Sequence, residues 1–407
     1  MDALKLVLIF VAIVIALRRK ISVGIVLLGA GLLMALLFQT GLRPLWQGYL
    51  DLVQSHNFIL LTSVVVLITF LGALLKELHF LDTLSSAVQG LPGGRRVAVF
   101  LLPPLIGLMP MPGGSLLSAP LVGNVLSDGS YAPEFKVSAN YWFRHFTEFI
   151  WPIYPGIILT EAVTGLPMAR VSVMQMPLSA LMIVIGLVMF TRRIKSNGGQ
   201  AARLAPSLAG IVKSLWPIGL AIALYGLLKI DLTWAILIAA AALIVTVRPP
   251  RAAMMIATRT ALSPKLILLV FGVLSFQMVI ELSEAVGFIP DLAARYHFPE
   301  EVVVFLVCFT IGILTGMVSA YVGLGYALLA GFLCQPVPDP SLIMLAYLSG
   351  FVGVMMSPSH LCLILTNEYF GSDLMKVYKT LAIPISILMV LGAIITLTGW
   401  PDLFRLP

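Results

Sequence analysis

The stretch that decides the fold is "IGLMPMPGGSLLSAPL", residues 106–121. It lies inside a long apolar segment, yet it carries three prolines and a Gly-Gly pair. Each proline removes a backbone donor and clashes with the preceding turn, so a continuous helix cannot run through this segment. We therefore predict that the chain is interrupted here, in the middle of an apolar region.

Composition indicates the class of protein. Sixty per cent of the residues are hydrophobic and 11% are charged, whereas soluble domains carry about 25% charged residues. Apolar runs of roughly 18 or more residues cross a bilayer as helices, so we predict an all-α polytopic membrane protein with about ten transmembrane helices. The predicted spans are residues 3–17, 21–38, 57–76, 141–166, 171–190, 208–228, 232–247, 264–286, 341–366 and 380–399.

Two broken apolar stretches, 97–126 and 302–333, fit no single span. The longest polar segments, near 77–96 and 191–207, are too short to fold as domains and are expected to be linkers. A soluble catalytic or nucleic-acid-binding module is thereby excluded. The cysteines lack paired spacing and are expected to be small core residues, and no metal site is predicted. They are Cys308, Cys334 and Cys362.

The basic residues indicate the orientation in the membrane. The net charge is +7, and cytoplasmic loops of membrane proteins carry an excess of Lys and Arg. With ten spans and both termini outside, 19 of the 25 Lys and Arg residues fall on the cytoplasmic side and 6 on the other. We therefore predict a multi-pass protein of the cytoplasmic (inner) membrane with both termini on the periplasmic side. This topology explains the excess of basic residues, and no nucleic-acid partner is predicted.

The chain resembles itself at an offset of 206 residues. Predicted spans of one half fall on or near spans of the other, and "WPIYPGIILTEAVTG" (151–165) overlays "SPSHLCLILTNEYFG" (357–371) without a gap. The halves 1–206 and 207–407 then each contain five spans and one broken stretch. Because five is odd, the second half enters the membrane upside down. Inverted repeats of this kind are typical of secondary transporters.

We predict that each broken stretch is a re-entrant hairpin. Residues 97–126 would enter from the cytoplasm and turn at "PMPGG", and residues 302–333 would enter from outside and turn near "TGMVSAYVGLG" (315–325). Spans 141–166 and 341–366 are expected to be interrupted at "WPIYP" and "MSPSH". Irregular backbone at membrane depth occurs where it is buried in protein or lines a wet cavity. Two tips and two interrupted helices should therefore meet near the midplane.

These tips and breaks form the predicted binding site. Half-helix N-termini present unpaired N–H groups and a partial positive charge, which suits a carboxylate or another oxyanion. Unwound carbonyls suit a sodium ion. The alternative interpretation is that the glycines and prolines serve only as kinks, which are frequent in membrane helices. The predicted substrate-binding residues are Gly113, Gly114, Ser115, Ser118, Ser319, Ser357, Ser359 and His360.

Few ionisable residues fall inside the predicted spans. A lone charge at the bilayer centre costs about 2.5–3.5 kcal/mol, which makes Glu148, just before "WPIYP", the candidate carrier of a coupling ion. The alternative is a salt bridge of Glu148 at the cytoplasmic interface. The segment "NYWFRHF" (140–146) is expected to be an aromatic belt with snorkelling cations.

Three motifs carry a resemblance to a known family. "GLMPMPGGSLLSAPLVG", "NYWFRHFTEFIWPIYPGIIL" and "SPSHLCLILTNEYF" resemble the ten-helix prokaryotic membrane proteins of domain-of-unknown-function family 401, over nearly the whole chain. That family is similar in layout to the ion transporter superfamily, which includes sodium–dicarboxylate symporters and gluconate permeases. The resemblance implies paired hairpins, unwound helices, elevator-like movement and a homodimer. The Ser-Asn-Thr signature of the dicarboxylate symporters is absent, so dicarboxylate specificity and sodium coupling are not implied.

The sequence thus predicts an ion-coupled secondary transporter of a small anion, an organic carboxylate in the first place. Na⁺ or H⁺ would be the coupling ion, and no other cofactor is expected. A cation/proton antiporter is the alternative within this class, but it would require central carboxylates. An intramembrane enzyme is the alternative from another class. The sequence contains no HExxH, GxGD or Ser-Lys pairing, and we expect the protein not to be an enzyme.

Overall fold

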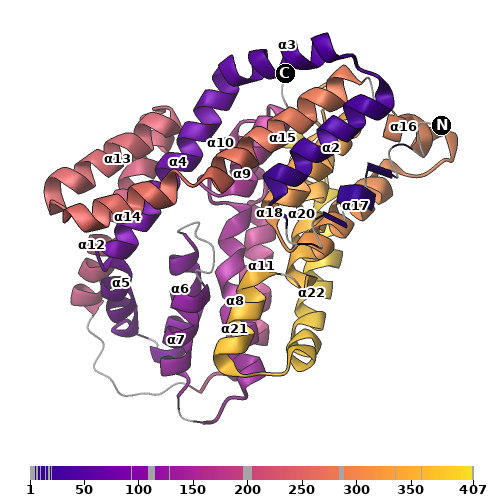
Figure 1. Ribbon diagram of the computed structural model, residues 1–407. Coiled ribbons are helices and arrows are strands. Elements are labelled where there is room, and N and C mark those ends of the chain that lie inside the picture. Colours follow the sequence, from indigo (N-terminus) through magenta and orange to yellow (C-terminus); the bar gives the residue numbers. More distant parts are fainter. Residues whose placement is uncertain are drawn as a thin grey trace.

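The computed structural model describes residues 5–405, except 6–7, 10, 14, 17–18, 20, 93, 109–114, 128, 196–203, 284–287, 335 and 359. The described residues contain helices and no strand, which confirms the predicted all-helical class. Figure 1 shows the arrangement of these helices.

Several helices are long and apolar enough to cross a membrane, as the composition predicts. The described residues contain six such segments, or seven if one bent pair, Pro155–Thr164 with Met168–Met174, counts as a span. The six are Phe58–Glu77, Met176–Arg193, Leu204–Gly226, Arg251–Leu282, Pro340–Phe370 and Leu374–Thr396. Two further apolar helices, Val23–Phe38 and Leu232–Val247, are shorter. The predicted span 3–17 lies mostly outside the described residues.

The first half of the chain contains the following described elements in order: α2 (Val23–Phe38), α3 (Leu42–Gln54), α4 (His56–Glu77), α5 (Phe80–Gln89), α6 (Gly94–Gly107), α7 (Ser115–Val125), α8 (Pro133–His145), η1 (Phe146–Phe149), α9 (Pro155–Thr164), α10 (Met168–Met174), α11 (Met176–Met189) and η2 (Thr191–Arg193).

The second half continues with α12 (Leu204–Gly226), α13 (Leu232–Val247), α14 (Arg251–Ala261), α15 (Pro264–Leu282), α16 (Phe288–Arg295), α17 (Glu300–Thr315), α18 (Val318–Ala320), the π-helical η4 (Tyr321–Tyr326), α19 (Ala330–Leu333), α20 (Pro340–Met356), α21 (Leu361–Phe370), α22 (Leu374–Thr396) and η5 (Pro401–Phe404).

One expectation about the linkers is wrong. Residues 77–96 are not a simple linker, because they contain α5 and the start of α6. Leu84 and Val88 of α5 are buried in a small apolar cluster with Leu102 of α6, and α5 also packs against α12. The apolar residues of this short polar segment recur at helical spacing, and this is enough to form a packed amphipathic helix.

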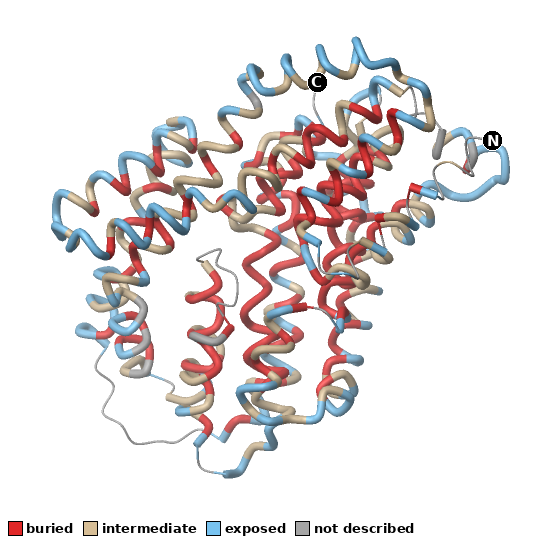
Figure 2. The backbone as a smooth tube through the Cα atoms, viewed as in Figure 1, coloured by how far each residue is buried: buried red, intermediate tan, exposed pale blue. Residues whose placement is uncertain are grey.

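The best-buried part of the molecule is built from α8 and α20. Every residue of α20 from Leu342 to Met355 is buried, and α8 is buried from Val137 to His145. In Figure 2 the buried colour is concentrated in these central helices, whereas α3, α13 and α14 are largely exposed or half-buried. A helix buried on all sides is a core helix of a large protein or a membrane helix surrounded by others.

α8 and α20 run in opposite directions. The start of α8 meets the end of α11 through Phe135 and Phe190, whose ring centroids lie 6.1 Å apart. The start of α20 lies instead beside η5, which follows the end of α22. Trp400, between α22 and η5, donates its indole N–H to the carbonyl of Met174, 2.8 Å away. Met174 is the last residue of α10 and lies two residues before α11 begins, so α8 and α20 begin at opposite ends of α11.

Candidate functional site

Both predicted helix interruptions are confirmed. α8 ends at His145, continues as the 3₁₀ turn η1, and leaves helical geometry before α9 begins at Pro155. α20 ends at Met356, and α21 begins at Leu361. Pro152 and Pro358 cannot donate to a helical ladder, and each disfavours helical geometry in the residue before it. The sequence therefore breaks both helices locally.

The turn between α17 and α18 touches the second break. Gly316 has φ +63°, a left-handed conformation that L side chains rarely adopt. A Cβ on Gly316 would lie 2.7 Å from the backbone nitrogen of His360 and 3.0 Å from the hydroxyl of Ser357. Only glycine allows this close approach. The predicted turn near residue 315 is thus present, and it packs directly on the interrupted helix.

The end of α6 touches the first break in the corresponding way. Trp151, in the interruption, donates its indole N–H to the carbonyl of Leu108, 3.0 Å away. A Cβ on Gly107 would lie 2.8 Å from the carbonyl oxygen of Arg144. α6 and α7 also pack against each other. α6 and α7 therefore form a packed pair, and α6 ends beside the first break. Residues 109–114, which include the predicted turn, lie outside the described residues.

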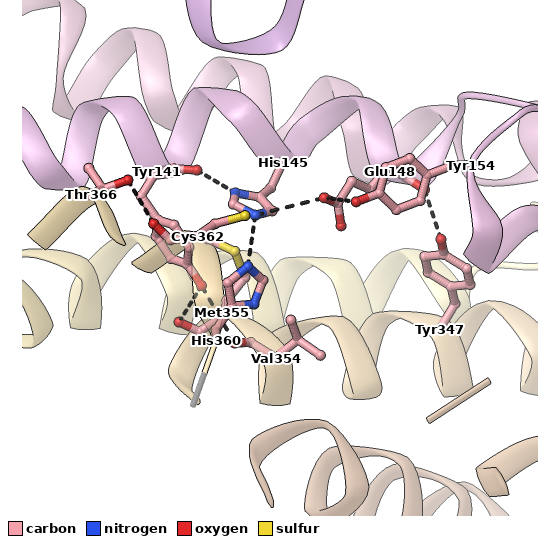
Figure 3. Close-up of polar contacts among 10 residues, drawn as sticks. All are labelled: Tyr141, His145, Glu148, Tyr154, Tyr347, Val354, Met355, His360, Cys362 and Thr366. Atoms are coloured by element: carbon pink, nitrogen blue, oxygen red, sulfur yellow. Dashed lines mark hydrogen bonds and ion pairs between the residues drawn. The ribbon is translucent and has the colours of Figure 1, made fainter. Parts of the chain in front are cut away.

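Two histidines join the breaks (Figure 3). His145, at the end of α8, points toward His360, just before α21, and their Nε2 atoms are 3.2 Å apart. The Nδ1 of His145 lies 2.6 Å from the carbonyl oxygen of Tyr141. Cys362, on the first turn of α21, places its sulfur beside both rings, and the three ligand atoms lie within 4.8 Å of one another. Both residue types, histidine and cysteine, can bind a transition metal.

A carboxylate approaches the same nitrogen of His145 that faces His360. The Oε1 of Glu148 is 3.7 Å from His145 Nε2 and accepts a hydrogen bond from the hydroxyl of Tyr154. The hydroxyl of Tyr347, on α20, donates to the main-chain carbonyl of Glu148 at 2.8 Å. The Oε2 of Glu148 has no hydrogen-bond partner among the described residues. Among those residues, Glu148 is the only buried acid.

Arg144 is the only buried Lys or Arg among the described residues, with 4% of its surface exposed. Its Nε and Nη1 find no hydrogen-bond partner in the part of the chain that the structure describes, and no ion pair joins it to a carboxylate there. The guanidinium lies near the end of α6, because Nη1 would be 3.6 Å from a Cβ on Gly107. The site thus contains one buried cation that forms no ion pair with a carboxylate in these residues and lies near the thiol of Cys362.

The predicted site residues divide into four groups. His360 and Glu148 belong to one cluster through His145. Ser357 is fully buried at the second break, and Ser319 lies on α18, which contacts α9 and α20. Ser115 is buried at the start of α7 and has no hydroxyl partner in the described residues, whereas Ser118 donates to the carbonyl of Ser115 at 3.3 Å. The other three, Gly113, Gly114 and Ser359, lie outside the described residues.

The expectation of an aromatic belt at 140–146 is wrong. Trp142 is fully buried and donates its indole N–H to the carbonyl of Met182 on α11, 2.9 Å away. Arg144 and His145 are likewise enclosed by neighbouring helices rather than placed at an interface. Sequence reasoning therefore missed both residues, as well as Cys362, Tyr154 and Tyr347. The available signal was the position of Arg144, His145 and Glu148 directly before a proline break.

Comparison with known protein families identifies one family. A family model described as "Protein of unknown function (DUF401)" matches residues 3–398. A search of curated proteins finds no match to this chain.

Proposed function

This chain belongs to the DUF401 family, and we propose that it is a secondary active transporter of a small anion with elevator-like alternating access. The substrate class is an organic carboxylate, and the protein acts in the cytoplasmic membrane with both termini outside. The architecture supports transport, the buried Arg144 supports an anionic substrate, and Glu148 supports coupling to a cation.

The two halves of the chain correspond element by element. α9 and α21 are both ten residues long, and their first residues, Pro155 and Leu361, are 206 positions apart. Both helices end at a left-handed glycine, Gly165 with φ +71° and Gly371 with φ +59°. Elements 206 residues apart also have matching neighbours. α7 packs on α21 just as α18 and η4 pack on α9. This agreement supports two repeats, 1–206 and 207–407.

The opposite directions of α8 and α20 support an inverted relation between these repeats. A pseudo-two-fold axis in the membrane plane reverses each element and its counterpart, and binding sites of such transporters lie where the repeats meet. The interruptions at residues 150–154 and 357–360 follow corresponding helices. The contact between His145 and His360 joins them across the repeat boundary.

Helix length supports the first re-entrant hairpin. A helix rises 1.5 Å per residue, so the 14 residues of α6 and the 11 of α7 extend about 21 Å and 16 Å. The hydrocarbon core of a bilayer is about 30 Å thick. Because α6 and α7 are each too short to cross it and pack against each other, they fit better as the two arms of a hairpin that enters and leaves by the same face.

Arg144 is the observation that carries the substrate assignment. A buried charge is costly unless it is paired, and Arg144 has no acidic partner among the described residues. A planar guanidinium binds a carboxylate through two parallel hydrogen bonds. Ser115 begins α7, an 11-residue helix whose N-terminus favours an anion. A small carboxylate would therefore supply the charge that Arg144 lacks.

Glu148 is the residue we assign to the coupling ion, sodium or a proton. Its Oε2 is buried and without a partner in the described residues. A cation bound there would be carried together with the anion on Arg144, four residues earlier. A cation/proton antiporter is less well supported, because Arg144 opposes the binding of a cation substrate.

A thermal-stability screen of the detergent-purified protein tests the substrate assignment. The panel contains acetate, lactate, succinate, citrate, phosphate and sulfate, each with and without sodium. A bound anion stabilises the folded protein by about 2.7 kcal/mol at a concentration 100 times its Kd. We expect at least one carboxylate to raise the unfolding temperature. Arg144→Gln should remove this effect, because losing hydrogen bonds to a charged group costs about 1.5–3 kcal/mol, or roughly ten- to a hundredfold in Kd.

Two controls make this screen decisive. Arg193→Gln changes an exposed arginine of η2 and should retain the carboxylate effect. Without ligand, Arg144→Gln should be at least as stable as the wild type, because it removes a buried charge that has no acidic partner among the described residues. If no anion of the panel stabilises the wild type, or if Arg144→Gln responds like the wild type, the assignment is wrong.

A further inference from the structure

His145, His360 and Cys362 form a group of metal-ligating side chains at the contact between the two breaks. Their ligand atoms all lie within 4.8 Å of one another. His145 is fully buried, His360 is 7% exposed, and Cys362 is half-buried and free of any disulfide. Figure 3 shows the imidazole of His145 reaching from α8 toward the ring of His360 and the sulfur of Cys362 at the start of α21.

The spacing of the two imidazoles matches a tetrahedral site. Zinc–nitrogen bonds are about 2.0–2.1 Å long, so two nitrogens on one tetrahedral zinc lie roughly 3.3–3.4 Å apart by geometry. The Nε2 atoms of His145 and His360 are 3.2 Å apart. Without a metal, this short approach requires one ring to donate its Nε2 proton to the other. With a metal, both Nε2 lone pairs would point to the same ion.

The surroundings of His145 orient it as a metal ligand. Its Nδ1 donates to the carbonyl oxygen of Tyr141, 2.6 Å away. Ligating histidines usually donate their second ring N–H to a carbonyl or carboxylate, which fixes the ring and leaves the other nitrogen for the metal. The edge of Tyr141 also packs against both imidazoles, with ring centroids 4.6 Å from His145 and 5.4 Å from His360.

Acidic groups beside the ligands offset most of the charge of a divalent ion. A Cys362 thiolate and the carboxylate of Glu148, whose Oε1 lies 3.7 Å from His145 Nε2, provide two negative charges, against three positive charges from the ion and Arg144. The set of two nitrogens and one sulfur favours Zn²⁺ over Mg²⁺ or Ca²⁺, which prefer oxygen ligands.

We propose that His145, His360 and Cys362 bind one divalent transition metal ion, with zinc as the best match, in a tetrahedral site whose fourth position is open. The ion joins the end of α8 to the start of α21 and so links the two interrupted helices. This site adjoins Arg144 and Glu148, but it is tested by a different readout, cobalt spectra rather than anion-dependent stabilisation.

Cobalt substitution tests the site in the full-length protein. The detergent-purified protein is stripped with a chelator and titrated with Co²⁺. We expect intense visible bands of tetrahedral cobalt and a near-ultraviolet sulfur-to-cobalt charge-transfer band, both saturating at one ion per chain. Zn²⁺ should displace the cobalt and abolish both signals.

Variants then assign the ligands. Cys362→Ser should lose the charge-transfer band. His360→Gln should weaken Co²⁺ binding at least about tenfold, the smallest loss seen even for outer-shell partners of a metal. The matched control is Cys334→Ser. Cys334 lies after α19 and donates its thiol to the carbonyl of Val163 at 3.7 Å, so this variant should keep the wild-type spectrum. The proposal is overturned if the wild type shows no tetrahedral bands, or if both ligand variants keep the wild-type spectrum and affinity.

Discussion

Glu148 can be changed so that binding and coupling are measured separately. Gln keeps an oxygen that accepts the hydrogen bond from Tyr154, but it cannot carry a proton or neutralise a bound sodium ion. We therefore expect Glu148→Gln to keep anion-dependent stabilisation and to lose nearly all gradient-driven uptake into proteoliposomes. Imposing a sodium gradient and a pH gradient in turn identifies the coupling ion. Uptake at the wild-type rate in this variant would contradict the assignment of Glu148 to the coupling ion.

At the residue scale, the sequence predicts local features but not contacts between distant residues. The breaks at Pro152 and Pro358 are local, because proline acts on its own turn, and both are where the sequence places them. The pairing of His145 with His360 joins residues 215 positions apart, and no local pattern specifies such a contact. The same holds for Arg144. In the sequence, its aromatic neighbours suggest a position at the membrane–water interface. In the structure, α11 and α20 cover these aromatic residues.

Among the helices, the α17–α20 pair offers a test of packing. A Cβ on Gly312 of α17 would collide with the carbonyl oxygen of Gly350 on α20 and lie 3.1 Å from the backbone nitrogen of Val354. These backbone atoms cannot move aside as the end of a flexible side chain can. Small residues allow membrane helices to approach this closely, and overpacking costs about 1–3 kcal/mol. We expect Gly312→Ala to lower the unfolding temperature of the purified protein.

Gly219→Ala is the matched control for this change. Gly219 lies in α12, and a Cβ there meets nothing within 4 Å. Alanine is favoured over glycine in a helix by about 1 kcal/mol, so this variant should be as stable as the wild type or more stable. Equal unfolding temperatures for Gly312→Ala and Gly219→Ala would contradict the close packing of α17 on α20.

The sequence was also a partial guide to the helices themselves. Apolar length located α4, α12, α13 and α15 to within a few residues, because burial in lipid or protein needs continuous apolar surface. It did not identify α5, where only one face is apolar. The shift of 206 residues anticipated the equal bounds of α9 and α21. It could not show that α7 packs on α21 and η4 on α9, since those contacts depend on the tertiary structure.

At the scale of the whole molecule, the described residues contain one buried cation, one buried acid and two interrupted helices that meet at His145 and His360. A receptor or an enzyme that only binds an anion could have the same features. Transport requires in addition that the same site opens to each side of the membrane in turn. Exchange of an anion across a sealed membrane is therefore the property that separates the proposed transporter from the other classes.

Counterflow measures this exchange directly. Proteoliposomes are loaded with the carboxylate that most stabilises the purified protein and are diluted into a trace of the same compound carrying an isotopic label. We predict that wild-type proteoliposomes accumulate the label transiently above protein-free liposomes, that Arg193→Gln behaves alike, and that Arg144→Gln does not accumulate it. Label in wild-type proteoliposomes no higher than in protein-free liposomes would contradict the proposed transport function.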